Sequence, residues 1–252
     1  MRWLENLRSQ LIRKRPPRSL SKALEERFTM GGVASIVYAY DDSSQRKNLY
    51  YTQEEVDEYI NKALQGKETE YGSMDGFIRD AIAAFPIKGL EVAIIGSEKP
   101  RYEALCLANG ARPVTIEYSM IPTNDARLEI TTPARVFGSG RKFDAAISLS
   151  TYEHSGLGRY GDPIDPDGDL TAMAQLKTIV KEGGIVFIAV PVGQEAVFFN
   201  LHRIYGAKRL ALLHQGWEVL GSFGFKESDF EEIDGSTQIH QPVFVMRNSP
   251  TK

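Results

Sequence analysis

Apolar runs of strand length recur in the second half of the chain, and segments of helix length separate them. Val92–Ile95 is wholly apolar, Phe143–Ser150 is nearly so, and Ile185–Val192 is the most apolar run of all. Strands that are buried on both faces have this composition, and they occur in parallel sheets covered by helices on each side. From residue 89 onward the chain therefore predicts an α/β fold with a doubly wound, mostly parallel sheet.

Further elements follow from shorter signals. Val114–Tyr118 predicts another strand, and Arg135–Phe137 predicts a weak one. Asp169 is expected to cap a helix that runs to Lys181, with a glycine pair ending it. Two late strands, Trp217–Phe225 and Pro242–Arg247, predict an antiparallel C-terminal hairpin.

The N-terminal third has a different texture. Val33–Tyr40 is either a short strand or a loop, while Thr52 with Glu55 three residues later forms a capping box before a helix to Leu64. Ser73 is expected to cap a helix through Phe85. We therefore expect three parts: a basic amphipathic segment at 1–30, a helical lead-in or cap at 31–88, and a Rossmann-like domain at 89–252.

Composition excludes several classes of function. The net charge of -3 over 252 residues provides no global field for nucleic acid. The single Cys106 excludes an intramolecular disulfide and a multi-cysteine metal site. Because there is no secretory apolar region and no run of about 18 apolar residues, the sequence predicts a cytoplasmic protein that does not span a membrane.

Positive charge is concentrated at the N-terminus. Residues 1–30 hold eight Lys or Arg against three Glu, a balance of +5. Met1–Arg15 places its apolar residues near helical spacing, which predicts a basic amphipathic helix. Such a helix either makes weak contact with an anionic membrane surface or packs on its own domain or a partner.

The order of these parts resembles the class I S-adenosylmethionine-dependent methyltransferases. "LEVAIIGSEKPRYEALCLANGA" stands where their first strand and glycine turn lie, "PVTIEYS" looks like their second strand, and "KFDAAISLSTYEH" is similar to their fourth. More narrowly, "EHSGLGRYGDPIDPDGDL" and "FNLHRIYGAKRLALLHQGWE" resemble an uncharacterised methyltransferase-like domain of unknown function. The resemblance implies a Rossmann-like methyltransferase fold with S-adenosylmethionine as cofactor.

The expected cofactor turn departs from the family pattern. Ile94 stands where those enzymes have an acid, and Gly96 is followed by Ser97 and Glu98 instead of further glycines. The resemblance implies cofactor contacts from Gly96, Ser97 and Glu98. Glu98 either supplies the missing carboxylate to the methionine amino group or is an exposed turn residue beside Lys99.

The resemblance also places Ser150 and Thr151, at the end of the fourth strand, beside the cofactor. Glu117 ends the second strand, 21 positions after Gly96. An acid there can accept hydrogen bonds from two ribose hydroxyls, a role that suits S-adenosylmethionine and NAD equally. The alternative is a strand-end carboxylate that caps a turn.

The loop after the fourth strand carries the candidate catalytic groups. Because His titrates near neutrality, His154 is either a general base beside Glu153 or a structural histidine bonded to Glu153 or to a loop carbonyl. Arg159, Tyr160 and Asp162 either bind a polar acceptor or hold the loop through an Arg159–Asp162 pair.

Two further features belong to the same region. The aspartates of this loop resemble the spacing of a calcium loop, but the closing glutamate is absent and prolines interrupt it, so no metal is expected. His202 and Arg203 either form the far wall of the acceptor pocket or belong to a packed helix with a surface Arg.

The sequence thus predicts an S-adenosylmethionine-dependent methyltransferase that acts on a small polar or glycan-like acceptor. The rival interpretation is a non-catalytic nucleotide- or S-adenosylmethionine-binding scaffold associated with carbohydrate metabolism, because a fold does not determine a function. A protein peripheral to a membrane surface is a third interpretation, which depends only on the N-terminal helix.

Overall fold

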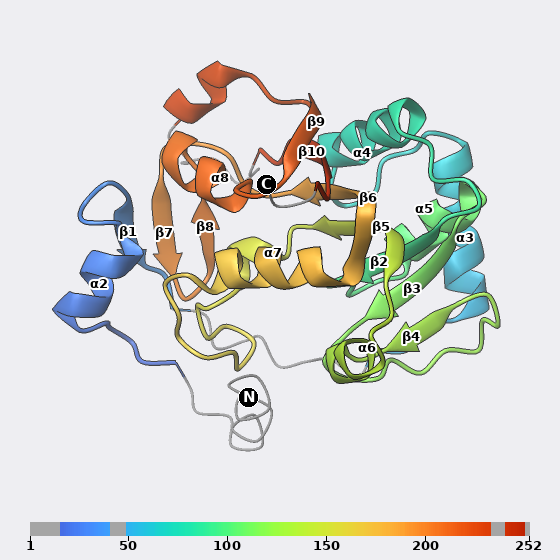
Figure 1. The fold of residues 1–252 in the computed structure, drawn as a ribbon, viewed down its shortest axis with the longest axis horizontal. Coiled ribbons are helices and arrows are strands. Elements are labelled where there is room, and N and C mark those ends of the chain that lie inside the picture. Colours follow the sequence, from blue (N-terminus) through green and yellow to red (C-terminus); the bar gives the residue numbers. More distant parts are fainter. Residues whose placement is uncertain (1–15, 41–48, 233–239, 250–252) are drawn as a thin grey trace.

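A seven-stranded sheet in the order β4-β3-β2-β5-β6-β10-β9 forms the centre of the molecule (Figure 1). The computed structural model describes residues 16–40, 49–232 and 240–249. Neighbouring strands from β4 to β6 are parallel, and β10 is antiparallel to both β6 and β9. This confirms the predicted doubly wound sheet with its C-terminal hairpin. The strands are β2 (Glu91–Ile95), β3 (Arg112–Ile116), β4 (Glu129–Thr131), β5 (Phe143–Leu149), β6 (Val180–Ala189), β9 (Glu218–Phe223) and β10 (Val243–Arg247).

Both faces of this sheet are covered by helices, which explains why its strands are apolar on both sides. Alternate residues such as Ile94 and Ile147 pack against α4 (Ser73–Ala84) and α5 (Arg101–Ala108). Their neighbours in the sequence point to the other face, where α6 (Pro133–Ser139), α7 (Gly168–Ile179) and α8 (Ala207–Leu213) lie. A further helix, α3 (Gln53–Leu64), packs on α5.

A second, three-stranded sheet joins distant parts of the chain. Its strands are β1 (Ser35–Tyr38), β7 (Ala196–Phe199) and β8 (His202–Ile204), with β1 parallel to β7 and β7 antiparallel to β8. The helix α2 (Lys22–Phe28) packs beside it. The two short helices η1 (Tyr152–His154) and η2 (Glu227–Glu231) complete the elements.

The described residues before β2 contribute a strand to the small sheet and a covering helix to the large one. Residues 31–88 hold β1 as well as α3 and α4, so this part is not purely helical. Because α4 shares a hydrophobic cluster with the main sheet, no separate core divides it from the Rossmann-like part. The division of the chain at residues 30 and 88 stays a prediction.

Of the two helix caps expected in the N-terminal third, one is found in its place. The Thr52 hydroxyl accepts a hydrogen bond from the Glu55 amide at 3.0 Å and caps α3, which confirms that N-cap. Ser73, in contrast, is the first residue of α4, and the cap position falls one residue earlier on Gly72.

The predicted strand at Arg135–Phe137 is wrong. These residues lie in α6, which begins at Pro133 and ends before Gly140, a residue in the left-handed region with φ 68°. Proline in the first turn and glycine after the last are a helix signature, since proline's missing N–H is unpaired there anyway. The edge strand of this region is instead the three-residue β4.

The predicted cap at Asp169 is also wrong. The helix α7 starts at Gly168 with Asp167 at its N-cap, and Asp169 is fully buried inside the first turn. The helix ends at Ile179, and β6 follows without a loop. The glycine pair therefore lies within the strand instead of ending the helix.

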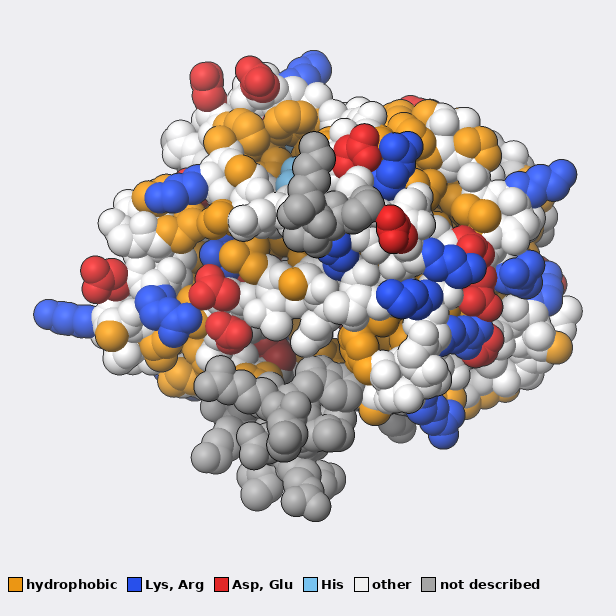
Figure 2. Space-filling view, in the orientation of Figure 1, with side chains coloured by type: hydrophobic (Ala, Val, Ile, Leu, Met, Phe, Trp, Pro, Cys, Tyr) orange, Lys and Arg blue, Asp and Glu red, His pale blue; other side chains and the backbone are white. Residues whose placement is uncertain are grey.

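The described part of the chain contains no helix that is both long and apolar enough to cross a membrane. The expected helix at Met1–Arg15 lies outside the described residues. On the face seen in Figure 2, acidic and basic side chains are interspersed.

Candidate functional site

The glycine turn after β2 touches the end of β5. Gly96 has φ 73°, and a Cβ atom at this position would lie 2.5 Å from Thr151 Oγ1. That hydroxyl lies 3.2 Å from the Ile95 carbonyl oxygen, to which it donates. Only glycine fits here, so the close approach of two strand ends explains the one glycine that the turn keeps.

Ser97 follows this glycine, and its hydroxyl joins a buried carboxylate. Ser97 Oγ lies 3.0 Å from Glu103 Oε2, and Thr115 Oγ1 donates to Glu103 Oε1 at 2.6 Å. Glu103 is fully buried in the first turn of α5, and burial raises the pKa of its carboxyl group. Sequence reasoning missed Glu103, although an acid within the apolar face of a helix is a recognisable signal.

Glu117 lies directly beside this turn. Its Oε1 accepts a hydrogen bond from the Ser97 amide at 3.2 Å, and its Oε2 accepts one from the Tyr118 amide at 3.1 Å. Tyr118 and Met120 follow at the same edge with 56% and 49% of their surface exposed. The structure therefore brings Gly96, Ser97 and Glu117 together, as expected for a strand-end ligand site.

Glu98 is exposed at the tip of the turn, and Lys99 beside it pairs with Glu70 at 2.8 Å. The negative charge of Glu98 raises the pKa of His154 and of Tyr160, although burial has the larger effect on both. The turn and the loop after β5 thus face one another.

The loop begins with a strained residue and a buried carboxylate. Ser150 has φ 53°, an uncommon conformation for a residue with a side chain. Its hydroxyl donates to Glu153 Oε1 at 2.8 Å and accepts from the Gln241 amide at 3.2 Å. Glu153 is 1% exposed, and no hydrogen-bond partner for its Oε2 exists among the described residues. Burial raises the pKa of Glu153 to about 7.

His154 is held by a main-chain carbonyl. Its Nδ1 lies 2.6 Å from the Leu201 oxygen. A carbonyl only accepts hydrogen bonds, so Nδ1 carries the proton and Nε2 is the free acceptor. Arg159 Nη1 is a second donor to the same oxygen at 3.5 Å, which explains its 3.4 Å approach to Nδ1.

From the sequence, His154 is expected to titrate near neutrality, but in the folded protein its pKa lies below that of Glu153. Burial lowers the pKa of His154 to about 4, so its ring is neutral at pH 7. His154 Nε2 lies 3.7 Å from Glu153 Oε1. Of the two groups, Glu153 is therefore the one that titrates near neutrality.

Asp162 organises the loop through its main chain. Its carboxylate accepts hydrogen bonds from the amides of Gly156 at 2.7 Å, Gly158 at 3.1 Å and Tyr160 at 3.2 Å. Tyr160 remains 37% exposed, and the Arg159 guanidinium lies 5.3 Å from its ring centre. Among Arg159, Tyr160 and Asp162, Tyr160 is thus the side chain most accessible to an acceptor.

His202 and Arg203 lie in β8, so the expectation of helical packing with a surface Arg is wrong. Both are buried, at 8% and 2% exposure. The His202 ring stacks on Phe198 with 5.0 Å between centroids, and Arg203 donates to main-chain carbonyls. Acceptor binding by either residue stays a prediction. Within the described ranges, no group of three or more His, Cys, Asp and Glu side chains is placed to hold a metal ion.

Residues 89–249 match the family described as "Caenorhabditis protein of unknown function, DUF268". The chain belongs to this family. Both specific blocks, from Glu153 and from Phe199 onward, fall inside the match. No curated protein matches the sequence.

Solved structures share the fold. The 1,6-didemethyltoxoflavin-N1-methyltransferase of Burkholderia thailandensis, with bound S-adenosylhomocysteine, is 16% identical at a TM-score of 0.56, covering 77% of this chain and 87% of that one. A putative methyltransferase of Haloferax volcanii in complex with Trm112 is 15% identical at 0.47, covering 77% and 98%. The N-methyltransferase NodS of Bradyrhizobium japonicum is 11% identical at 0.47, covering 69% and 93%. The chain therefore has a class I methyltransferase-like fold.

Proposed function

We propose that this protein is an S-adenosylmethionine-dependent methyltransferase. The observation that carries the proposal is the position of Glu117, between the glycine turn of β2 and the end of β3. The most similar of the structures named above binds S-adenosylhomocysteine on the same fold, which supports this choice of cofactor.

The residues at this edge fit such a cofactor. The carboxylate of Glu117 would accept hydrogen bonds from ribose hydroxyls, since a carboxylate is an acceptor only. The exposed apolar surface of Tyr118 and Met120 suits a planar base. Glu98 would pair with the amino group, while Ser150 and Thr151 would lie at the reacting end.

When bound, S-adenosylmethionine supplies an electrophilic methyl group. The chain would then orient a small polar or glycan-like acceptor and remove its proton. We assign the role of the base that takes this proton to Glu153, because its pKa of about 7 suits a base better than the pKa of His154 does. Arg159, Tyr160, Asp162, His202 and Arg203 remain the candidate surroundings of the acceptor.

A non-catalytic nucleotide- or S-adenosylmethionine-binding scaffold associated with carbohydrate metabolism is the second candidate. The turn with a single glycine favours it, since Gly96 is followed by Ser97 and Glu98 where the related enzymes have further glycines. This candidate shares the binding edge but has no use for a base at Glu153.

Calorimetric titration with S-adenosylhomocysteine tests the proposal. Glu117→Gln keeps the shape of the side chain but removes its charge, so affinity should fall by about 1–3 kcal/mol, roughly 5- to 150-fold. Glu182→Gln, a change at an exposed carboxylate, should leave affinity unchanged. No binding to the wild type at millimolar ligand refutes the proposal. Binding of NAD or a nucleotide sugar in its place supports the scaffold.

A further inference from the structure

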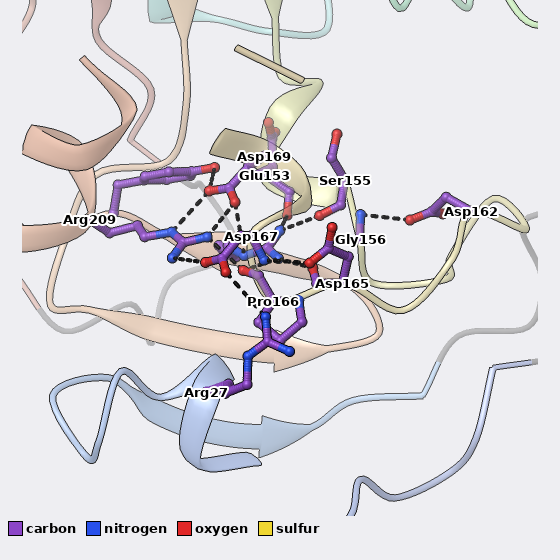
Figure 3. A network of polar contacts seen from close by, with 12 residues as sticks. Arg27, Glu153, Ser155, Gly156, Asp162, Asp165, Pro166, Asp167, Asp169 and Arg209 are labelled. Atoms are coloured by element: carbon purple, nitrogen blue, oxygen red, sulfur yellow. Dashed lines mark hydrogen bonds and ion pairs between the residues drawn. The ribbon is translucent and has the colours of Figure 1, made fainter. Parts of the chain in front are cut away.

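The two sequence blocks that resemble the uncharacterised methyltransferase-like domain form one polar network (Figure 3). The first block runs from Glu153 through the loop into the first turn of α7 at Leu170, and the second runs through β8 into α8. Two arginines of the second block, Arg203 and Arg209, reach into the loop. Both donate to the Pro166 carbonyl, and beyond this shared contact they hold different parts of the loop.

Arg203 holds the turn that carries the candidate base. Its Nη1 donates to the carbonyl oxygens of Ser155 at 2.6 Å and of Glu153 at 3.4 Å. Its Nη2 donates to those of Asp165 and Pro166, both at 3.3 Å. The first two carbonyls flank His154, so the guanidinium fixes the main chain on both sides of that residue.

Arg209 holds the far end of the loop instead. Its Nε donates to Asp169 Oδ2 at 3.1 Å, and its Nη2 contacts both Asp169 Oδ1 and the Pro166 carbonyl. Tyr205 donates its hydroxyl to the same carboxylate at 2.9 Å. These contacts of Arg209 do not reach the main chain around His154.

The segment around β8 therefore fixes His154 twice. The Leu201 carbonyl binds the ring, and Arg203, two residues later, binds the main chain on either side of it. A guanidinium can do this because its donors point in several directions in one plane, whereas a lysine ammonium is a compact point charge. Phe28 of α2 lies 5.7 Å from the Arg203 guanidinium carbon and covers it.

We propose that Arg203 is a positioning residue for the Glu153–His154 turn. In this role it acts through the main chain, by way of the carbonyl oxygens that its guanidinium contacts. By holding the turn, it keeps His154 in the Nδ1–H tautomer and Glu153 against Ser150. Its part in a reaction rests on the methyltransferase proposal, but the geometric claim stands independently of it.

Nitrogen NMR of the histidine rings tests the claim in the full-length chain at pH 7. The wild type should show one ring, assigned to His154 by loss of its signals in His154→Gln, with Nδ1 protonated and Nε2 free. Arg203→Lys should lose this signature. Arg209→Lys is the matched control, since it also alters a buried arginine of the network but should retain the signature while lowering the melting temperature.

The outcomes separate a positioning role from a merely structural one. Retention of the tautomer in Arg203→Lys, or its equal loss in both variants, overturns the proposal. Should Arg203→Lys not fold, solvent exchange of the Arg203 Nη protons in the wild type decides: slow exchange is expected, and fast exchange contradicts the carbonyl contacts.

Titration with S-adenosylhomocysteine keeps this result distinct from the methyltransferase proposal. Arg203→Lys should bind it within about twofold of the wild type, because Arg203 is not among the groups beside Glu117. If the wild type does not bind it, the methyltransferase proposal fails while the NMR result on Arg203 remains valid.

Discussion

The buried carboxyl group of Glu153 makes the stability of the protein depend on pH in an unusual direction. Burial raises its pKa from 4.5 to about 7, with the Ser150 hydroxyl opposing the change. The folded state thus holds the proton more tightly than the unfolded state. The stabilisation from this proton is complete below pH 4.5 and is lost as pH rises through about 7.

Glu153→Gln removes this dependence without changing the size of the side chain. A pKa difference of about 2.5 corresponds to about 3 kcal/mol, since each pKa unit is worth about 1.4 kcal/mol. We expect the variant to gain about 2–3 kcal/mol of unfolding free energy relative to the wild type between pH 5 and pH 8. Urea unfolding followed by circular dichroism at both pH values measures it.

A titrating group that does not contact Glu153 cancels in this comparison. Burial lowers the pKa of His214 to about 4, so His214 destabilises the fold as pH falls below 6.5, in variant and wild type alike. Glu182→Gln, at an exposed carboxylate, should show no pH-dependent difference. An equal difference between Glu153→Gln and the wild type at both pH values would refute the reasoning, because Glu153 would then ionise normally.

Three further outcomes are expected. Asp169→Asn should cost about 3–5 kcal/mol in thermal unfolding because it leaves a buried arginine without its carboxylate, whereas Asp167→Asn, at a half-exposed pair, should cost at most about 1 kcal/mol. Gly96→Ala should lower stability by more than the roughly 1–2 kcal/mol of its left-handed backbone, and adding Thr151→Ala should recover part of the loss; strict additivity would contradict the contact. Removal of residues 1–15 should reduce flotation with anionic liposomes, more so at low salt, and equal partitioning of both chains would rule out a membrane contact.

The central strands could be predicted from the sequence because the signal for each strand lies in its own residues. A strand such as β6 is apolar on both faces wherever helices cover both sides, and its composition records this. The same holds for Thr52, whose cap depends on an amide three residues away. The helix α6 could also have been predicted from local sequence. The proline at its start and the glycine after its end outweigh the β-branched Val136 within it.

The remaining features depend on partners far along the chain. Asp169 has the sequence appearance of an N-cap, and Arg203 and Arg209, 34 and 40 residues later, make it a buried ion-pair partner. Gln241 reaches Ser150 across 91 residues. Glu153 and His154 were identifiable as site candidates, but their protonation depends on burial, which the sequence of the loop does not record.

The parallel pairing of β1 with β7 has a consequence during synthesis. Ser35 pairs with Ala196, and the register continues to Tyr38 and Phe199. At about 5–20 residues per second, the partner of β1 leaves the ribosome roughly 10–30 s after β1 itself. Among the described strands, the first to be made therefore waits for one made much later. Until then its edge stays open to pairing with another nascent chain, so slow translation before residue 199 should increase aggregation through this segment.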